Sequence, residues 1–272
     1  MKTGLRDLLK LDDLRVFDGK PGDVDVDILP DGGSNAALLD SIPSGKNLIT
    51  KAARAYFSAA GRSAKIVVRL EKNIPAGGGL GGGSANAASM LRLLQRSLSA
   101  LSDEELRNAA AQTGADVPFC LNDGAALCEG TGEVIERVSH NLRCSVLIVN
   151  DGTHVDTKWA YEAVDAVKHY APVDAESVRV KKKALADFLI KGEISKLRDL
   201  CRNDFERPVF DAFPSVEELK KTLVGGGSDF SIMTGSGSTV IGLFVDRSSA
   251  DRTYKSFIDK GISAWLTEFV AG

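Results

Sequence analysis

The sequence predicts an α+β protein, because strand and helix signals follow one another without a regular repeat. Three observations carry this prediction. Residues 65–71 have the pattern of a strand, Gly77–Gly83 contains six glycines, and residues 87–98 have the pattern of a helix. The region from residue 157 to 201 is mainly helical, and residues 231–244 form a strand, a glycine/serine turn and a second strand.

Composition sets the broad class. The chain has 272 residues, 43% of them hydrophobic and 26% charged, which is typical of a soluble globular protein with one large or two small domains. A net charge of -3 argues against a general nucleic-acid binder. The four cysteines form no C-x-x-C pair, and the three histidines are scattered, so no metal site is expected from them. With no signal peptide and no long apolar run, we expect a cytoplasmic protein without membrane contact.

The glycine-rich stretch is the main functional signal. It lies between the strand and the helix, with Ser84 where we expect the helix N-cap. Glycine lets backbone N–H groups turn toward a ligand, and a helix N-terminus adds unpaired donors and partial positive charge. The arrangement therefore favours an anion site, with phosphate as the usual occupant, over a flexible linker. Gly77–Gly82 also fits G-x-G-x-x-G, but so many glycines fit many patterns, and no Walker A lysine follows.

The other elements of the first half follow from periodicity and capping signals. Residues 5–16 resemble a turn or short helix leading into a strand. Residues 24–29 alternate as an edge strand does, with three aspartates on the opposite face. A turn is expected at Pro30–Gly33, and helices at 47–60 and 103–112, the second with a Ser102–Glu105 capping box. A strand pair is expected at 125–129 and 133–138.

Asp116 is the candidate catalytic carboxylate. It follows a helix end and precedes a proline and an aromatic residue in apolar surroundings. A carboxylate in such a place needs hydrogen-bond partners or takes part in chemistry, although a turn aspartate is the simpler interpretation.

The second half begins near Asn141 with a strand at 144–149. Helices are expected at 157–167, 178–190, 194–201, 216–223 and 249–260, with a short segment from Asn203 to Pro214 and a last strand at 262–269. The turn at 234–239 offers N–H groups and hydroxyls to an oxyanion, but it is also consistent with a simple hairpin turn.

Three motifs together resemble the GHMP kinase superfamily: the stretch from Pro75 to Ala88, Gly114-Ala-Asp-Val-Pro-Phe, and Thr234-Gly-Ser-Gly-Ser-Thr. Asn47-Leu-Ile, Asn203-Asp-Phe-Glu and Phe210-Asp-Ala-Phe-Pro are similar to one branch, the kinases of 4-diphosphocytidyl-2-C-methyl-D-erythritol in non-mevalonate isoprenoid biosynthesis. The resemblance implies two lobes: a ribosomal-protein-S5-like lobe at 1–141 and a ferredoxin-like lobe at 142–272. It also implies an ATP-dependent kinase, monomeric or weakly dimeric, that phosphorylates the 2-hydroxyl of that cytidine diphosphate-linked methylerythritol.

The resemblance also implies residue roles. Asp116 corresponds to the catalytic base, Ser84 would contact phosphate or Mg²⁺, and Thr157 and Tyr161 would line the cytidine end of the substrate, together with the turn Gly235, Ser236 and Gly237. Residues that would bind ATP are Asn47, Leu48, Lys72, Pro75, Ala76, Gly77, Gly78, Gly79, Leu80, Gly81, Gly82, Gly83, Ser84 and Ala85.

Two departures from the family pattern affect the expected activity. Ala85 stands where the family usually has a second serine, so one hydroxyl near the phosphates is lost. The opening Pro-Ala-Lys-x-Asn strand and the Gly-Tyr-His motif of the family are not found in this chain. We therefore expect a truncated or divergent form with little kinase activity. The alternatives are a nucleotide-binding pseudokinase or regulator without catalysis, and a kinase of another small alcohol.

Overall fold

The computed structural model describes residues 5–36, 47–75, 77–122, 124–132, 134–166 and 174–269. Its contacts divide the chain into two compact units. The N-terminal unit comprises Leu5–Ala76 and Gly81–Glu136, and the C-terminal unit includes Gly77–Leu80 and Arg137–Gly272. The change at residue 136 lies close to the predicted boundary at 141/142, which stays a prediction.

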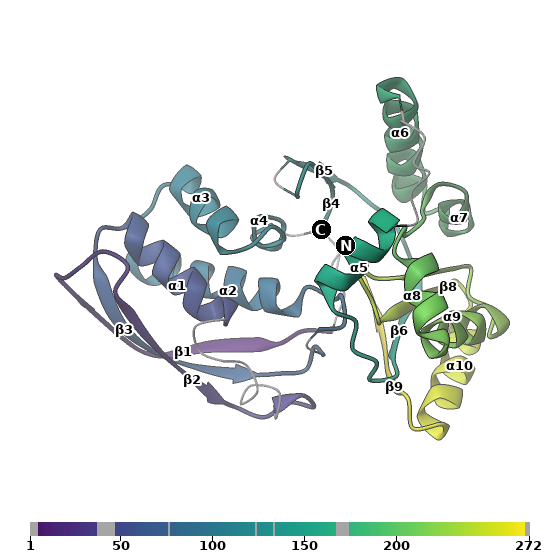
Figure 1. Ribbon diagram of the computed structural model, residues 1–272, viewed down its shortest axis with the longest axis horizontal. Helices are drawn as coiled ribbons and strands as arrows, with labels where there is room; N and C mark the ends of the chain where they lie inside the picture. The colour runs from purple at the N-terminus through teal and green to yellow at the C-terminus, as the bar shows by residue number, and fades with distance from the viewer. Residues whose placement is uncertain are drawn as a thin grey trace. The chain divides into compact units, whose positions relative to one another are not determined.

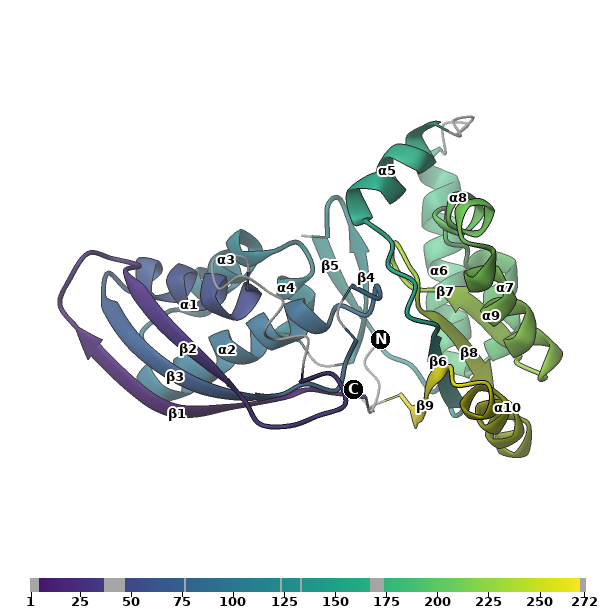
Figure 2. The same ribbon diagram turned by 60° about the horizontal axis from the view of Figure 1, so that its bottom comes forward.

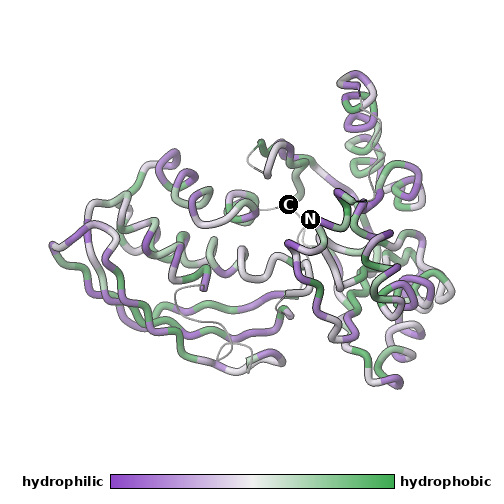
Figure 3. The backbone as a smooth tube through the Cα atoms, viewed as in Figure 1, coloured by the Kyte–Doolittle hydropathy of each residue, from purple (hydrophilic) through white to green (hydrophobic). Residues whose placement is uncertain are grey.

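The N-terminal unit is built on a three-stranded sheet in the order β1-β3-β2, formed by Leu8–Phe17, Ser63–Glu71 and Val24–Pro30. Strand β1 runs antiparallel to β3, and β2 runs parallel to it. In the part of the chain that the structure describes, β1 and β2 are therefore the two edges, as predicted for residues 24–29. The strands alternate between hydrophobic and hydrophilic residues, since one face is buried and the other meets water (Figure 3).

Helices cover the buried face of this sheet. Figure 1 shows α1 (Leu48–Ala59) and α2 (Gly82–Leu98) side by side over it, with α3 (Asp103–Thr113) beyond them. Alternate residues of β3 pack against their apolar faces. The fully buried side chains of this core include Tyr56, Phe57, Ile66, Met90, Leu91 and Leu94.

Side-chain caps begin two of the helices in this unit. Asn47 caps α1, its side chain accepting from the N–H of Ile49 at 2.9 Å, and α3 has the predicted Ser102–Glu105 capping box. A short helix, α4 (Val117–Cys120), follows, and α4 packs on α2 through Arg92, whose Nη1 donates to the Cys120 carbonyl at 2.8 Å. Strands β4 (Ala125–Glu129) and β5 (Val134–Val138) pair as predicted.

The C-terminal unit contains a four-stranded sheet in the order β7-β8-β6-β9, formed by Phe230–Met233, Val240–Phe244, Ser145–Asn150 and Ser263–Glu268. All of its strand pairs are antiparallel, and β6 is buried along its whole length. Figure 2 shows α9 (Pro214–Gly225) and α10 (Arg247–Asp259) on one face of this sheet. They bury Val216, Leu219, Leu223, Ala250 and Phe257 against it.

The remaining helices of this unit are α5 (Thr157–Ala166), α6 (Ala175–Lys191), the 3₁₀ turn η3 (Ile194–Lys196), α7 (Leu197–Leu200) and α8 (Glu206–Ala212). The single helix expected at 194–201 is thus a 3₁₀ turn followed by one α-helical turn. The predicted α+β organisation is confirmed. Within the described residues, none of the helices combines the length and the apolar character needed to cross a membrane.

Candidate active site

The second half of the glycine-rich stretch, with the helix that follows it, presents unpaired backbone donors. Helix α2 begins at Gly82, and its N-cap is Gly81, which adopts the left-handed conformation with φ 65° and has no side-chain capping bond. The prediction that Ser84 is the N-cap is therefore wrong. Ser84 is the third residue of the helix, because the left-handed glycine starts the helix without a side-chain oxygen. The N–H groups of Gly82, Gly83 and Ser84 lie in the first turn, where no intrahelical acceptor exists.

Space is available beside Gly81, at the N-cap of α2. A Cβ added to Gly81 would meet no atom within 4 Å. At Gly83 it would lie 3.4 Å from Cδ1 of Leu48, so Leu48 lies beside the first turn of α2. Asn47, by contrast, uses its side-chain oxygen to cap α1. Ala85 is half-buried, and its N–H makes the first helical bond, to the carbonyl of Gly81 at 2.9 Å. Ala76 lies outside the described residues.

The tip of the glycine-rich stretch, Gly77–Leu80, belongs to the C-terminal unit and packs on the turn between β7 and β8. The Gly78 carbonyl accepts from the N–H of Thr239 at 3.3 Å and from the Thr234 hydroxyl at 3.4 Å. Any Cβ on Gly79 would overlap the Thr234 carbonyl oxygen, so the two backbones touch. Two of the three predicted motifs thus meet in space.

The predicted substrate residues of the C-terminal unit also gather at this turn. The hydroxyls of Thr157, at the start of α5, and Ser236, in the turn, lie 3.1 Å apart. Tyr161 is 60% exposed, and its ring meets that of Phe205 edge-on with centroids 4.9 Å apart. Gly235 and Gly237 both have positive φ, and the Gly235 carbonyl accepts from Asn203 Nδ2 at 2.8 Å. The structure therefore brings hydroxyls, an exposed aromatic ring and a fixed backbone turn together.

Asp116 is exposed at the N-terminal end of α4. Burial and, second, the negative charge of Asp116 raise the pKa of the Cys128 thiol on β4, which indicates that the carboxylate lies near this strand. No ion-pair partner of Asp116 is found within the ranges that the structure describes. The predicted catalytic carboxylate is thus accessible to a substrate and has no ion-pair partner from the described part of the chain.

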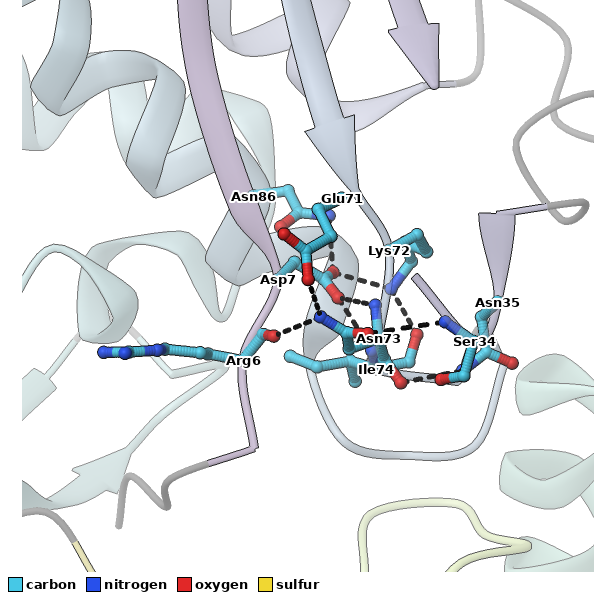
Figure 4. Close-up of polar contacts among 9 residues, drawn as sticks. All are labelled: Arg6, Asp7, Ser34, Asn35, Glu71, Lys72, Asn73, Ile74 and Asn86. Atoms are coloured by element: carbon cyan, nitrogen blue, oxygen red, sulfur yellow. Dashed lines mark hydrogen bonds and ion pairs between the residues drawn. The ribbon is translucent and has the colours of Figure 1, made fainter. Parts of the chain in front are cut away.

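Lys72 does not offer its ammonium group to a ligand. Nζ forms an ion pair with Asp7 at 2.7 Å and donates to the Ile74 carbonyl, and the two charged side chains are only 5% and 1% exposed (Figure 4). The backbone of Lys72 is engaged as well, since its N–H donates to the Gly32 carbonyl at 3.0 Å and its carbonyl accepts from the N–H of Asn35 at 2.8 Å. The prediction that Lys72 borders the adenine stays open, but a role for its charge is not supported.

A metal ion has few protein ligands here. Among the described residues, no group of three or more His, Cys, Asp and Glu side chains is arranged to hold one. The Ser84 hydroxyl is a single neutral oxygen, which suits a Mg²⁺ ion bound mainly through phosphates and water. The donor set of the protein is therefore compatible with a metal that arrives with a nucleotide.

Sequence reasoning missed Asp7 and the structural roles of Asn86 and Asn203. Asn86 and Asn203 stand inside motifs that carried the resemblance, but nothing in their local pattern shows a partner. Asp7 had no local signal at all, because its partners are 65 to 79 positions away along the chain.

Comparison with known proteins gives concordant matches. The model of the GHMP kinases N terminal domain matches residues 47–124, and that of the GHMP kinases C terminal domain matches residues 185–263. The protein of Prosthecochloris aestuarii named 4-diphosphocytidyl-2-C-methyl-D-erythritol kinase is 39% identical over 208 residues, covering 76% of this chain and 70% of the relative. The Solidesulfovibrio magneticus protein of the same name is 35% identical over 263 residues, covering 93% and 82%.

Solved structures agree with these relatives. A crystal structure of 4-(cytidine 5'-diphospho)-2C-methyl-D-erythritol kinase superposes with a TM-score of 0.72 at 28% identity, covering 99% of this chain and 88% of the other. Homoserine kinase from Cytophaga hutchinsonii superposes with a TM-score of 0.70 at 18% identity, covering 95% and 87%, which shows a shared fold alone.

Proposed function

Because the chain belongs to the 4-diphosphocytidyl-2-C-methyl-D-erythritol kinase family of the GHMP kinases, we propose that it transfers the γ-phosphoryl group of ATP to the 2-hydroxyl of 4-diphosphocytidyl-2-C-methyl-D-erythritol. This reaction belongs to the biosynthesis of isoprenoid precursors. The observation that carries the proposal is the start of α2, where a left-handed Gly81, open space and unpaired first-turn N–H groups coincide in the motif shared with the family.

The backbone of this region suits the phosphates of ATP. Phosphoryl transfer depends on positioning and charge stabilisation more than on covalent chemistry. The N–H groups of Gly82, Gly83 and Ser84, with the positive end of α2, stabilise phosphate oxygens without rearrangement. Mg²⁺, when bound with ATP, would supply positive charge to the phosphate oxygens, and the Ser84 hydroxyl would offer it one protein oxygen.

The acceptor side is supported by the cluster at the β7–β8 turn and by Asp116. Tyr161 presents an exposed aromatic ring on which a pyrimidine base can stack, and Thr157 and Ser236 present hydroxyls. Asp116 accepts the proton of the attacking hydroxyl as general base. Its exposure gives the substrate access.

The transfer test uses the chain with Mg-ATP and 4-diphosphocytidyl-2-C-methyl-D-erythritol, following ADP and the phosphorylated product by mass spectrometry. Given the expected low activity, we expect slow product formation, which Asp116→Asn lowers by about 10²–10⁴-fold while ATP binding persists. Equal turnover of Asp116→Asn and the parent would show that Asp116 is only a turn residue. Absence of product with intact ATP binding would favour the second candidate, nucleotide binding without catalysis. The lack of an ion-pair partner for Asp116 in the described residues also favours this candidate.

The nucleotide test uses a matched pair of glycine variants. Gly81 and Gly61 have nearly the same backbone, φ 65° and 67°, and a Cβ at either position meets no atom within 4 Å. Asparagine tolerates this conformation, so Gly81→Asn and Gly61→Asn have similar backbone costs. Only Gly81→Asn places a side chain beside the first turn of α2, so only this variant should lose ATP affinity in calorimetry. Equal affinities of the two variants would refute this phosphate site.

A further inference from the structure

Asp7 precedes β1, and its side chain is almost completely buried. Its carboxylate accepts four hydrogen bonds, which nearly exhausts its capacity. Oδ1 accepts from the N–H groups of Asn73 and Ile74 at 2.6 and 2.7 Å. Oδ2 accepts from Lys72 Nζ at 2.7 Å and from Asn86 Nδ2 at 2.9 Å. A carboxylate with this many donors is held in one position.

These donors come from the two ends of the glycine-rich stretch. Residues 72–74 leave β3 just before it, and Asn86 lies one helical turn after Gly82, where α2 begins (Figure 4). The two ends also touch directly, since a Cβ at Gly82 would lie 2.8 Å from Cγ2 of Ile74 and 3.5 Å from Lys72 Nζ. Asp7, which lies outside the glycine-rich stretch, therefore links residues 72–74, the entry of the stretch, with the first turn of α2, its exit.

A second contact holds the entry from another side. The N–H of Asn35 donates to the Lys72 carbonyl at 2.8 Å, and its Nδ2 donates to the Asn73 carbonyl at 2.7 Å. Any Cβ on Gly33 would overlap the backbone of Lys72, so the two segments are in backbone contact. Because Gly33 and Asn35 hold the entry in place, the hydrogen bonds of Asp7 determine where α2 starts relative to β3.

The charges in this network cancel. A lone carboxylate near the start of α2 would repel phosphate, but Lys72 neutralises Asp7 within the buried cluster. The ion pair thus provides a strong acceptor for the backbone N–H groups of the entry and leaves the positive end of α2 to a ligand.

We propose that Asp7 is a positioning residue that fixes both ends of the glycine-rich stretch and thereby sets the affinity for the nucleotide phosphates. This inference rests on the proposed function for the identity of the ligand, but the holding of the stretch is a property of the protein alone. Loss of Asp7 should weaken ATP binding more than it slows transfer from bound ATP, because no atom of Asp7 belongs to the reacting groups.

The variants are Asp7→Asn and Asn86→Ala. Asp7→Asn keeps the shape and one acceptor oxygen but places an amide donor toward Lys72 and Asn86. Asn86→Ala removes only the hydrogen bond between Asp7 and α2 and keeps the ion pair between Asp7 and Lys72. It is therefore the alternative test variant if Asp7→Asn does not fold. Tyr56→Phe is the control, since it removes the half-buried 2.9 Å bond from the Tyr56 hydroxyl to Gln95, near the other end of α2. The same change also removes the longer bonds of this hydroxyl with the Leu94 carbonyl and the Ala100 N–H.

Two readouts are compared at a temperature where all variants are folded by circular dichroism. Hydrogen exchange of residues 72–86 without nucleotide should accelerate in Asp7→Asn and Asn86→Ala, relative to Tyr56→Phe. The KM and Kd for ATP should rise about tenfold in Asp7→Asn, with kcat changed less than about threefold, consistent with loss of uniform binding.

The outcomes separate the two proposals. Parent-like exchange in residues 72–86 of both variants would overturn the role of Asp7, whether or not ATP binds. Equal effects in Tyr56→Phe would show a general loss of stability and would overturn it as well. If the parent itself does not bind ATP, the proposed function fails, and the exchange data alone decide whether Asp7 holds the stretch.

Discussion

Replacing Lys72 by methionine should destabilise the protein strongly, because it leaves Asp7 as an unpaired buried charge. The side chains are 5% and 1% exposed, so solvent does not compensate the loss. Breaking a buried ion pair by removing one partner costs about 3–5 kcal/mol. Asp7 keeps three uncharged donors, and methionine fills most of the volume of the lysine stem, so we expect the lower end, about 3 kcal/mol.

A double-mutant cycle isolates the ion pair. Asp7→Asn combined with Lys72→Met removes both charges, so the double variant should be less destabilised than the sum of the two single changes by at least about 1.5 kcal/mol. Lys65→Met, on the strand β3 that ends just before Lys72, is the matched control. Its partner Asp25 and Lys65 itself are 67% and 54% exposed, and an exposed pair contributes about 0–1 kcal/mol.

Urea unfolding should be followed by far-ultraviolet circular dichroism. Tryptophan fluorescence alone would not suffice, since Trp159 and Trp265 both lie in the C-terminal unit. A free energy of unfolding for Lys72→Met within about 1 kcal/mol of the parent would refute the reasoning, because breaking a buried pair costs more than this. If the two single changes in the free energy of unfolding simply add up in the double variant, the two charges do not interact, and the reasoning is refuted as well.

Three further predictions concern other sites. Gly79→Ala should lower the Tm more than Gly61→Ala, since both glycines have positive φ but only a Cβ at residue 79 overlaps Thr234; equal Tm values would contradict this close approach. Asp116→Asn should accelerate alkylation of Cys128 by iodoacetamide near neutral pH, because removing the carboxylate lowers the pKa of the thiol, while Cys144, whose pKa burial raises to about 11, should react slowly in both proteins. Hydrogen bonds from the Ser102 backbone and side chain lower the pKa of Glu105. The stabilisation that the Glu105 carboxylate provides is therefore complete above its unfolded-state pKa of about 4.3, and it is lost as the pH falls through the lower pKa of the folded state. The Tm difference between the parent and Glu105→Ala should therefore narrow in acid, and a constant difference would contradict the capping role.

Local patterns predicted most of the fold. Alternation identified β2, a cluster of apolar residues identified β3, and apolar residues at helical spacing identified α1 and α2. The Ser102–Glu105 pair identified the start of α3. These signals succeed because the residues that decide each element are neighbours in sequence. The N-cap rule failed at Ser84, because the left-handed Gly81 begins α2 without the side-chain cap that the rule assumes.

The sequence predicted residues of the candidate site itself, but not the residues that hold them in place. The sequence indicated the glycine-rich stretch, Thr157 and the β7–β8 turn, and the structure shows how Thr157 meets Ser236. Lys72 shows the limit of this reasoning. The family resemblance implied a nucleotide contact for this residue, but a carboxylate 65 residues earlier in the chain holds its ammonium group.

The contact between Gly78 and Thr234 has a consequence for synthesis of the chain. The two residues are 156 positions apart, so a ribosome working at about 5–20 residues per second reaches Thr234 roughly 8–30 s after Gly78. During that interval the emerging β3 and α2 have no hairpin on which the tip Gly77–Leu80 can pack. The nascent chain therefore acquires the final conformation of this segment late, after β7 and β8 have left the ribosome.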